Sequence, residues 1–305
     1  MNFLKRTIAG VLCLSMIVSL VGCGSGNSTS SSTADSGKPT IRVGSKDFTE
    51  GLIVSEIYAL ALEKAGYPVE RVFDISGSLV HTALTSDQID LYPEYTGTGL
   101  LSVLGMDLIT DPQQVYDTVK QEYEKQFHIT WLNYAQANDG QGMVIRTDVA
   151  KKLGISTISD LQAHAQELRF ASQGEFDERA DGLPALVAKY GAFDWKSTKV
   201  YDGGLKYQVL ANNEADVTVG YTTDGALADT DTYTLLTDDQ QVWPPYNRAP
   251  VVRDDVLEKA PGIADVLNAV SAKLDTATLT QMNAKVDVQK EEYEDVAAEF
   301  FNSIQ

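Results

Sequence analysis

The sequence predicts an α/β fold with two lobes and a ligand cleft between them. Three observations support this prediction. Residues 40–92 alternate between strand-like and helix-like apolar patterns, residues 137–241 repeat the alternation, and the proline-rich stretch "VWPPYNRAPVV" (242–252) leads to three further helical segments. Two α/β units joined by short links are typical of a two-lobed protein, in which ligands bind at the carboxyl ends of strands.

The first unit follows a βαβαβ order. "TIRVGSKDF", "VERVFDI" and "IDLY" have the composition and alternation of strands. The first connecting helix is expected to begin with Thr49 as its N-cap and to end at Gly66. A short helix is expected at 78–86, and mostly helix at 100–128. Short βαβ connections imply parallel strands with right-handed crossovers.

The second unit and the C-terminal part have similar signals. Strands are expected in "GMVIRTD", "LRFAS", "TKVYD" and "ADVTVGYTTDG", and helices in "ISDLQAHAQ", with Ser159 as N-cap, "GLPALVAKYG" and "LKYQVLANN". Three more helices are expected within 262–274, 276–286 and 291–301. We therefore expect residues 40–136 and 242–305 to form one lobe, and residues 137–241 to form the other.

A targeting segment precedes the first unit. Lys5 and Arg6 begin it, and residues 8–20 form an apolar run that is too short for a stable membrane-spanning helix. Residues 1–22 are therefore predicted to be a lipoprotein signal peptide. The run "LVGC" resembles a bacterial lipobox that ends at Cys23, the predicted lipidation site; an ordinary signal with an incidental cysteine is the alternative. Residues 23–39 have the Gly/Ser-rich composition of a flexible tether.

Composition and motifs exclude several classes of function. The formal charge is −19, and loss of Lys5 and Arg6 would leave −21, which argues against a basic nucleic-acid-binding face. Cys13 and Cys23 are the only cysteines, so the mature domain has no disulfide or thiolate metal site. The sequence contains no catalytic or phosphate-binding signature, and we expect no metal and no cofactor. Three histidines lack metal-ligand spacing: His81, His128 and His164.

Tyrosines and cationic residues lie where the predicted strands end. Tyr95 and Tyr221 end strands of different units, and Tyr246 lies in the crossing segment. Aromatic faces suit a quaternary ammonium, which has no N–H to donate, at roughly 0.5–2 kcal/mol for each cation–π contact. A set of cationic or hydroxyl side chains is suited to a carboxylate: Lys46, Thr98 and Arg179. Together they describe a site for a small zwitterion, with core packing as the alternative role of any single tyrosine.

Five ordered motifs carry a resemblance to a known family. They are "VGSKDFTEGLIVSEIYALALEKAGY", "IDLYPEYTGTGLL", "EFDERADGLPAL", "GYTTDG" and "WPPYNRAPVVR". The chain resembles the substrate-binding lipoproteins of glycine betaine/choline ABC importers, the osmoprotectant-binding family, from about residue 40 to residue 300. The resemblance implies a class II periplasmic-binding-protein fold that closes around a quaternary ammonium compound.

The resemblance also assigns roles to individual positions. It implies a cation cage of Tyr95, Tyr221 and Tyr246, with the backbone carbonyl of Asp139 facing the cation. It further implies that Lys46, Thr98 and Arg179 hold the ligand carboxylate, with Gly97 leaving room for close approach. Glycine betaine is then the leading ligand, with carnitine, proline betaine and choline as related candidates. A cationic pocket end would repel choline unless nearby carboxylates offset it.

One position departs from the family pattern. Gln141 stands where relatives often have a cage tyrosine. We expect either an open cage on that side or another aromatic residue in its place, Tyr116 or Tyr134. The amide of Gln141 would alternatively donate to a ligand hydroxyl, as in choline or carnitine. This departure leaves the identity of the ligand more open than its class.

Alternatives to a transport protein make distinct demands on the site. A carboxylate-based hydrolase would use Asp90 and Glu94 as an acid/base pair in the cleft. A hydrogen-bonded loop carboxylate is the favoured interpretation of Glu94, and packing or support of the site that of Tyr92. A sensory lipoprotein would bind the same ligands but signal to a receptor.

The favoured interpretation is therefore a solute receptor and not an enzyme. Its expected partners are a small quaternary ammonium ligand and an ABC permease with its ATPase. The lipid would hold it at the outer face of the cell membrane, and we expect a monomer without nucleic acid.

Overall fold

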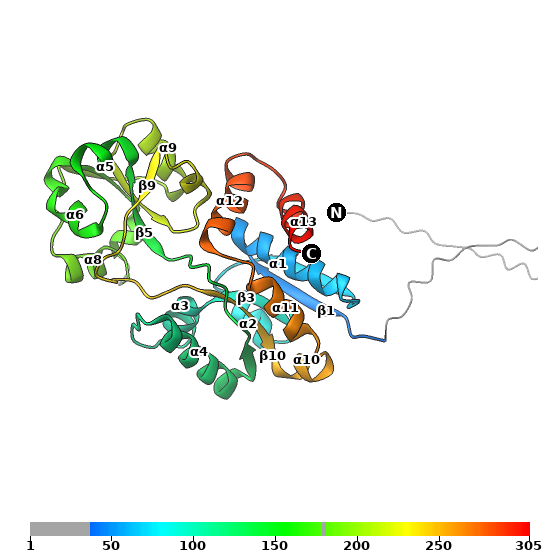
Figure 1. Cartoon of the computed structure of the whole chain (residues 1–305). Helices are drawn as coiled ribbons and strands as arrows, with labels where there is room; N and C mark the ends of the chain where they lie inside the picture. Colours follow the sequence, from blue (N-terminus) through cyan, green and yellow to red (C-terminus); the bar gives the residue numbers. More distant parts are fainter. Residues whose placement is uncertain (1–36, 179–180) are drawn as a thin grey trace, which may run out of the picture. The chain divides into compact units, whose positions relative to one another are not determined.

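The computed structural model describes residues 37–178 and 181–305, which form two five-stranded mixed sheets with flanking helices (Figure 1). The predicted signal peptide, Cys23, most of the tether and Arg179 lie outside the described residues. In the described part of the chain, no helix is both long and apolar enough to cross a membrane.

The first sheet has the strand order β2-β1-β3-β10-β4. Its strands are β1 (Ile41–Lys46), β2 (Val69–Ile75), β3 (Leu91–Tyr95), β4 (Ile129–Trp131) and β10 (Arg248–Arg253). β1 is parallel to β2 and β3, as the βαβαβ prediction requires, whereas β10 is antiparallel to both β3 and β4. The crossing segment therefore returns to the middle of this sheet.

Helices cover both faces of the first sheet. Leu91 and Val252 pack against α1 (Thr49–Lys64), α11 (Ile263–Ser271), α12 (Thr276–Asp287) and α13 (Tyr293–Ser303). The neighbouring residues Tyr92 and Val251 face the opposite cluster with α2 (Val80–Thr85) and α4 (Pro112–Phe127). Successive strand residues point to opposite faces, so a strand buried on both sides is continuously apolar. α10 (Asp254–Lys259) follows β10 directly.

The second sheet is made entirely by residues between 141 and 235, in the order β7-β6-β8-β5-β9. Its strands are β5 (Gln141–Arg146), β6 (Arg169–Ser172), β7 (Ser197–Val200), β8 (Val217–Tyr221) and β9 (Tyr233–Leu235). The helices are α5 (Thr147–Leu153), α6 (Ile158–Ala163), α7 (Gly174–Glu178), α8 (Leu183–Tyr190) and α9 (Lys206–Ala211). Met143 packs toward α5, α6 and α8, and its neighbour Val144 toward α9.

Two connecting segments run side by side between the sheets. Asn138 and Asn247 form an antiparallel bridge, and the Asn247 amide donates to the Ala135 and Ala137 carbonyls. A second contact lies between α12 and the 3-10 turn η4 (Gly225–Ala228). A Cβ added to Gly225 would lie 2.6 Å from the Ala284 nitrogen, so this approach requires glycine.

Several local predictions differ from the structure. Thr49 is the first residue of α1 rather than its N-cap, and its hydroxyl donates to Asp287 instead (2.6 Å). Thr157, with Asp160, forms the capping box of α6, whereas Ser159 lies inside the helix. The expected helix at 100–128 is interrupted at residues 104–111, and Asp111 caps α4. The three-residue strands β4 and β9 were not predicted.

Two prolines lie opposite each other in the centre of the first sheet. Pro93 of β3 pairs in register with Pro250 of β10. The Pro250 carbonyl accepts from the Leu132 N–H (3.0 Å), so the Pro250 nitrogen also faces away from β3. Its missing N–H therefore removes no hydrogen bond from the β3–β10 ladder.

Replacement of Gly225 by alanine should destabilise the chain. The added methyl would meet backbone atoms of α12, which cannot rotate away, and overpacking of this kind costs typically about 1–3 kcal/mol. We expect the free energy of unfolding, measured by denaturant titration, to fall by that amount. Gly174→Ala is the matched control, because its new methyl meets its nearest atom at 3.7 Å. Equal stability of the two variants would contradict this account.

Candidate ligand-binding site

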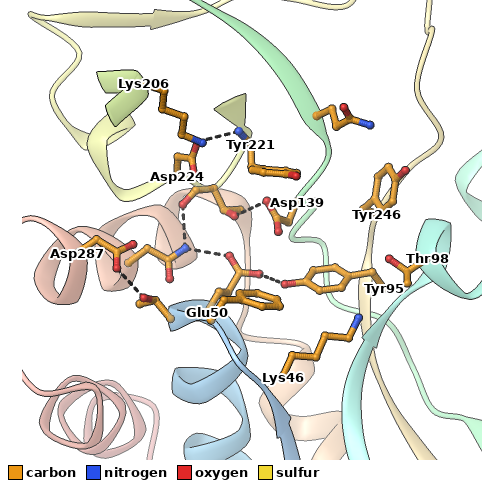
Figure 2. Close-up of a pocket in the computed structure, with 15 residues that line it drawn as sticks. Lys46, Glu50, Tyr95, Thr98, Asp139, Lys206, Tyr221, Asp224, Tyr246 and Asp287 are labelled. Carbon is orange, nitrogen blue, oxygen red and sulfur yellow. Dashed lines mark hydrogen bonds and ion pairs between the residues drawn. The ribbon is translucent and has the colours of Figure 1, made fainter. Parts of the chain in front are cut away.

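A cavity of about 460 Å³ lies at the carboxyl ends of β1, β3 and β8 (Figure 2). Strand ends of both sheets contribute to its wall, as expected for α/β sheets. Seven predicted residues line it: Lys46, Tyr95, Thr98, Asp139, Gln141, Tyr221 and Tyr246. Eight further residues also line it: Phe48, Thr49, Glu50, Lys206, Thr223, Asp224, Asn283 and Asp287.

Tyr95 is held by a buried ion pair. Arg248 lies directly opposite Tyr95 on β10, and its guanidinium carbon is 4.4 Å from the centroid of the Tyr95 ring. Arg248 pairs with Glu50 at 3.0 Å, and their side chains are only 1% and 3% exposed. The Tyr95 hydroxyl donates to the same carboxylate (2.9 Å). Burial lowers the pKa of Arg248, and the charge of Glu50 opposes that shift.

Lys46 ends β1 and is neutralised by a buried carboxylate. Its ammonium pairs with Glu94 at 2.5 Å and lies 5.1 Å from the centroid of the Tyr95 ring. Glu94 also accepts from the Tyr92 hydroxyl (2.8 Å) and the Tyr95 N–H (2.7 Å). Tyr92 is fully buried, which confirms its predicted packing and supporting role. Glu94 is confirmed as a hydrogen-bonded carboxylate.

Tyr221 ends β8 on the other side of the cavity. Tyr221 is 43% exposed, and the Lys206 ammonium lies 5.1 Å from the centroid of its ring. Lys206 pairs with Asp224 at 2.6 Å, and Asp224 also accepts from the Tyr221 N–H (2.8 Å). Figure 2 shows Lys206, Asp224 and Tyr221 together above the Tyr95 ring.

Tyr246 owes its position to Gly97. A Cβ on Gly97 would lie 2.7 Å from two carbon atoms of the Tyr246 ring. The sequence alone suggests that the small size of Gly97 allows the close approach of a ligand. The structure corrects this interpretation, because the Tyr246 ring takes that space. Thr98, the next residue, lines the cavity beside Tyr246 (Figure 2).

A chain of hydrogen bonds joins the two sides of the cavity. Asn283 of α12 donates through its amide nitrogen to Glu50 (2.9 Å) and to the Thr223 carbonyl (2.8 Å). The Thr223 hydroxyl in turn donates to the Asp139 carboxyl (2.7 Å). Burial, and then the nearby charge of Glu50, raises the pKa of Asp139 well above its ordinary value.

Neither Tyr116 nor Tyr134 takes the place of the cage tyrosine that is missing at Gln141. The Gln141 amide donates to the Asp181 carboxylate at 3.0 Å. The rings of Tyr116 and Tyr134 contact each other in a tilted arrangement, 4.9 Å between centroids, and neither residue lines the cavity. Phe48 does line it, nearly parallel to the Tyr95 ring at 6.2 Å between centroids. Phe48 and Glu50 lie within one of the family motifs, but no signal in the sequence distinguishes them as residues of the site.

The hydrolase alternative lacks its acid/base pair. Asp90 does not line the cavity, and it pairs with Arg42 at 2.6 Å and with Arg253 at 3.5 Å. Glu94 is engaged by Lys46 and is only 1% exposed. The predicted pair in the cleft is therefore absent from the part of the chain that the structure describes.

Comparisons with known proteins agree with this arrangement. The family model OpuAC, described as the substrate binding domain of the ABC-type glycine betaine transport system, matches residues 39–303. The chain is 36% identical to the glycine-betaine-binding protein of Pseudomonas aeruginosa over 271 residues, which is 86% of each chain. It is 35% identical to the carnitine transport binding protein OpuCC of Listeria monocytogenes over 87% of each chain.

A solved structure is similar over nearly all the described residues. The crystal structure of a glycine betaine/carnitine/choline ABC transporter has a TM-score of 0.81 at 27% identity, covering 86% of this chain and 98% of that chain. The predicted two-lobed periplasmic-binding-protein fold is thereby confirmed.

Loss of Arg248 should be far more harmful than loss of an exposed charge. Arg248→Met leaves Glu50 buried without its cation, and breaking a buried pair costs roughly 3–5 kcal/mol. Asp148→Asn breaks a pair in which the carboxylate is 66% exposed, at an expected cost below about 1 kcal/mol. Denaturant titration of both variants measures the difference. Similar losses would contradict a structural role for the Glu50–Arg248 pair.

Proposed function

Because the chain belongs to the family of substrate-binding domains of ABC-type glycine betaine transport systems, we propose that it captures a small quaternary ammonium zwitterion for an ABC importer. The observation that carries this proposal is the convergence of Tyr95, Tyr221 and Tyr246 on one cavity that also contains Lys46 (Figure 2). Members of this family are transport proteins, so the chain is not an enzyme.

The three tyrosines form the cation end of the proposed site. They come from β3, β8 and the crossing segment, so the ligand would contact both sheets. A quaternary ammonium spreads its charge over its methyl groups and is best met by aromatic faces. We assign the cage to Tyr95, Tyr221 and Tyr246, with the Asp139 carbonyl as a further contact.

The carboxylate end of the proposed site is formed by Lys46, Thr98 and Arg179. The assignment of Arg179 rests on its place in "DERADG" alone. Lys46 lines the cavity at the end of β1, which supports its assignment, and its ammonium pairs with Glu94. A ligand carboxylate would therefore meet a partly compensated ammonium. Glycine betaine leads the candidates, followed by carnitine and proline betaine.

The electrostatic repulsion of choline should be weaker than the sequence alone indicates. The expected repulsion required an uncompensated cationic end, and Glu94 offsets Lys46. Gln141 is engaged by Asp181, which leaves its amide poorly placed to bind a ligand hydroxyl. We propose that choline binds more weakly than glycine betaine, because choline has no carboxylate for Thr98 and Lys46.

We also propose that the chain divides into two lobes. Residues 40–136 and 242–305 would form one lobe and residues 137–241 the other, with hinges near 137 and 242. The separate sheets and the paired crossing segments support this division. Ligand binding would bring the lobes together, and the closed form would dock on the permease.

The remaining proposals concern location and assembly. A lipid on Cys23 would hold the protein, as a monomer, at the outer face of the membrane beside the permease and its ATPase. The lipobox-like "LVGC" and the Gly/Ser-rich tether support the anchor.

A ligand panel tests the proposed function. Purified protein is titrated by calorimetry with glycine betaine, carnitine, proline betaine, choline and proline, the last lacking a quaternary nitrogen. We expect the strongest binding for a carboxylated quaternary ammonium and none for proline. Thermal unfolding should show the same ranking of ligands, because a ligand at 100 times its Kd increases the free energy of unfolding by about 2.7 kcal/mol. Absence of binding to every quaternary ammonium would refute the proposal.

Tyr221→Ala should weaken glycine betaine binding at least about tenfold, or 1.4 kcal/mol. The ring is partly exposed at the cavity, so its removal should leave the fold intact. Tyr221→Phe is the control, since it keeps the aromatic face and should retain most of the affinity. Calorimetry of both variants measures the contribution of the face; equal losses would exclude a cage role.

A further inference from the structure

We infer that the side-chain carboxyl of Asp139 binds the ligand cation. This carboxyl holds a proton in the empty site and releases it when a quaternary ammonium enters. This inference rests on the proposed function and adds a role for the side chain to that of the backbone carbonyl. It makes binding an exchange of a cation for a proton.

The position of Asp139 places its carboxyl in the proposed cage. Its backbone N–H donates to the Tyr246 carbonyl (3.1 Å), and its side chain lines the cavity with Tyr221 and Tyr246. Figure 2 shows the Asp139 carboxyl between the Tyr221 ring and the Tyr95 ring. A cation enclosed by these rings would therefore lie next to this carboxyl.

Asp139 has no cation within the described residues, unlike three other buried or half-buried carboxylates around the cavity. Glu50 pairs with Arg248, Glu94 with Lys46, and Asp224 with Lys206. Within residues 37–178 and 181–305, no ion pair involves Asp139, and its one side-chain hydrogen bond comes from Thr223. A single hydroxyl donor compensates an ionised carboxylate only in part.

The charged and titratable groups around Asp139 favour its neutral form. Glu50 of α1 and Asp224 after β8 place negative charge nearby, and Lys206 of α9 is the cation that opposes them among the residues that the structure describes. The ammonium of Lys206 is already engaged by Asp224 at 2.6 Å. Tyr207 of α9 is a neutral phenol, because burial and Asp224 raise its pKa. Two more charged groups line the same cavity: Lys46 and Asp287.

A bound quaternary ammonium reverses this balance. It brings a positive charge beside Asp139, which favours the ionised carboxylate and lowers its pKa toward the ordinary value. The O–H bond of Asp139 breaks, the electron pair stays on the carboxylate, and the proton goes to the buffer, since the ligand nitrogen cannot accept it. A ligand carboxyl ionises well below about pH 5 and contributes no proton above it.

The affinity for the ligand should therefore depend on pH. The pKa of Asp139 is raised in the empty site, so the proton is bound there below that raised value. The bound ligand lowers the pKa, so release occurs between the two values. Within this window affinity should increase with pH by up to about tenfold per pH unit, and it should level off above the pKa of the empty site.

Calorimetry of the full chain with glycine betaine counts the proton directly. At one pH, the observed enthalpy is measured in buffers of different ionisation enthalpy, and the slope gives the protons released. The series is repeated between about pH 5.5 and pH 8.5. We expect release of up to one proton per ligand in the window, together with tighter binding at higher pH.

Three variants assign the proton. Asp139→Asn should bind glycine betaine more weakly, with no proton release and no pH dependence. Thr223→Val removes the donor to the ionised form and should move the window to higher pH. Asp287→Asn, the matched control, removes another cavity carboxylate and should keep the proton release.

The outcomes separate the inference from the proposed function. Binding of glycine betaine without proton release throughout the series would overturn the inference and leave the proposed function intact. Proton release that persists in Asp139→Asn would overturn the assignment to Asp139. Failure to bind any quaternary ammonium would overturn both.

Discussion

The buried ion pair between Glu50 and Arg248 is the interaction on which the cavity depends. Glu50 lies in the first turn of α1, and Arg248 is the first residue of β10, so the pair connects two elements that are far apart in sequence. The same carboxylate holds the Tyr95 hydroxyl and the Asn283 amide. Because both ions are almost fully buried, each must keep its partner. One wall of the cavity is thus fixed before any ligand arrives.

The two lysines that line the cavity are also paired with carboxylates. Lys46 and Lys206 each neutralise a carboxylate, and each lies near the face of a tyrosine. Paired charges produce only a weak electric field at a distance. Binding of the ligand would therefore depend on short-range contacts with aromatic rings, hydroxyl groups and individual hydrogen-bond donors. This suits a zwitterion, whose own net charge is zero.

The sequence predicted the alternation of strands and helices well, because buried parallel strands and amphipathic helices have distinct periods. It could not predict the partners that tertiary structure supplies. Threonine is a residue type that often caps helices, yet the Thr49 hydroxyl donates a hydrogen bond to Asp287, 238 positions later in the chain. Glu50 resembles an exposed acidic residue of a first helical turn, yet in the fold it is buried in contact with Arg248 of β10 and Asn283 of α12. β4 and β9 are too short to give an alternating pattern.

The facing prolines of the first sheet have a consequence for the position of the site. If β10 slipped by one residue, Pro250 would turn its nitrogen toward β3, where a ladder hydrogen bond would be lost. The same slip would turn Arg248 to the opposite face of the sheet, away from Glu50. The missing N–H of Pro250 therefore penalises the wrong alignment of the strand that carries Arg248. A residue that does not line the cavity thus disfavours a slip that would displace the cavity wall.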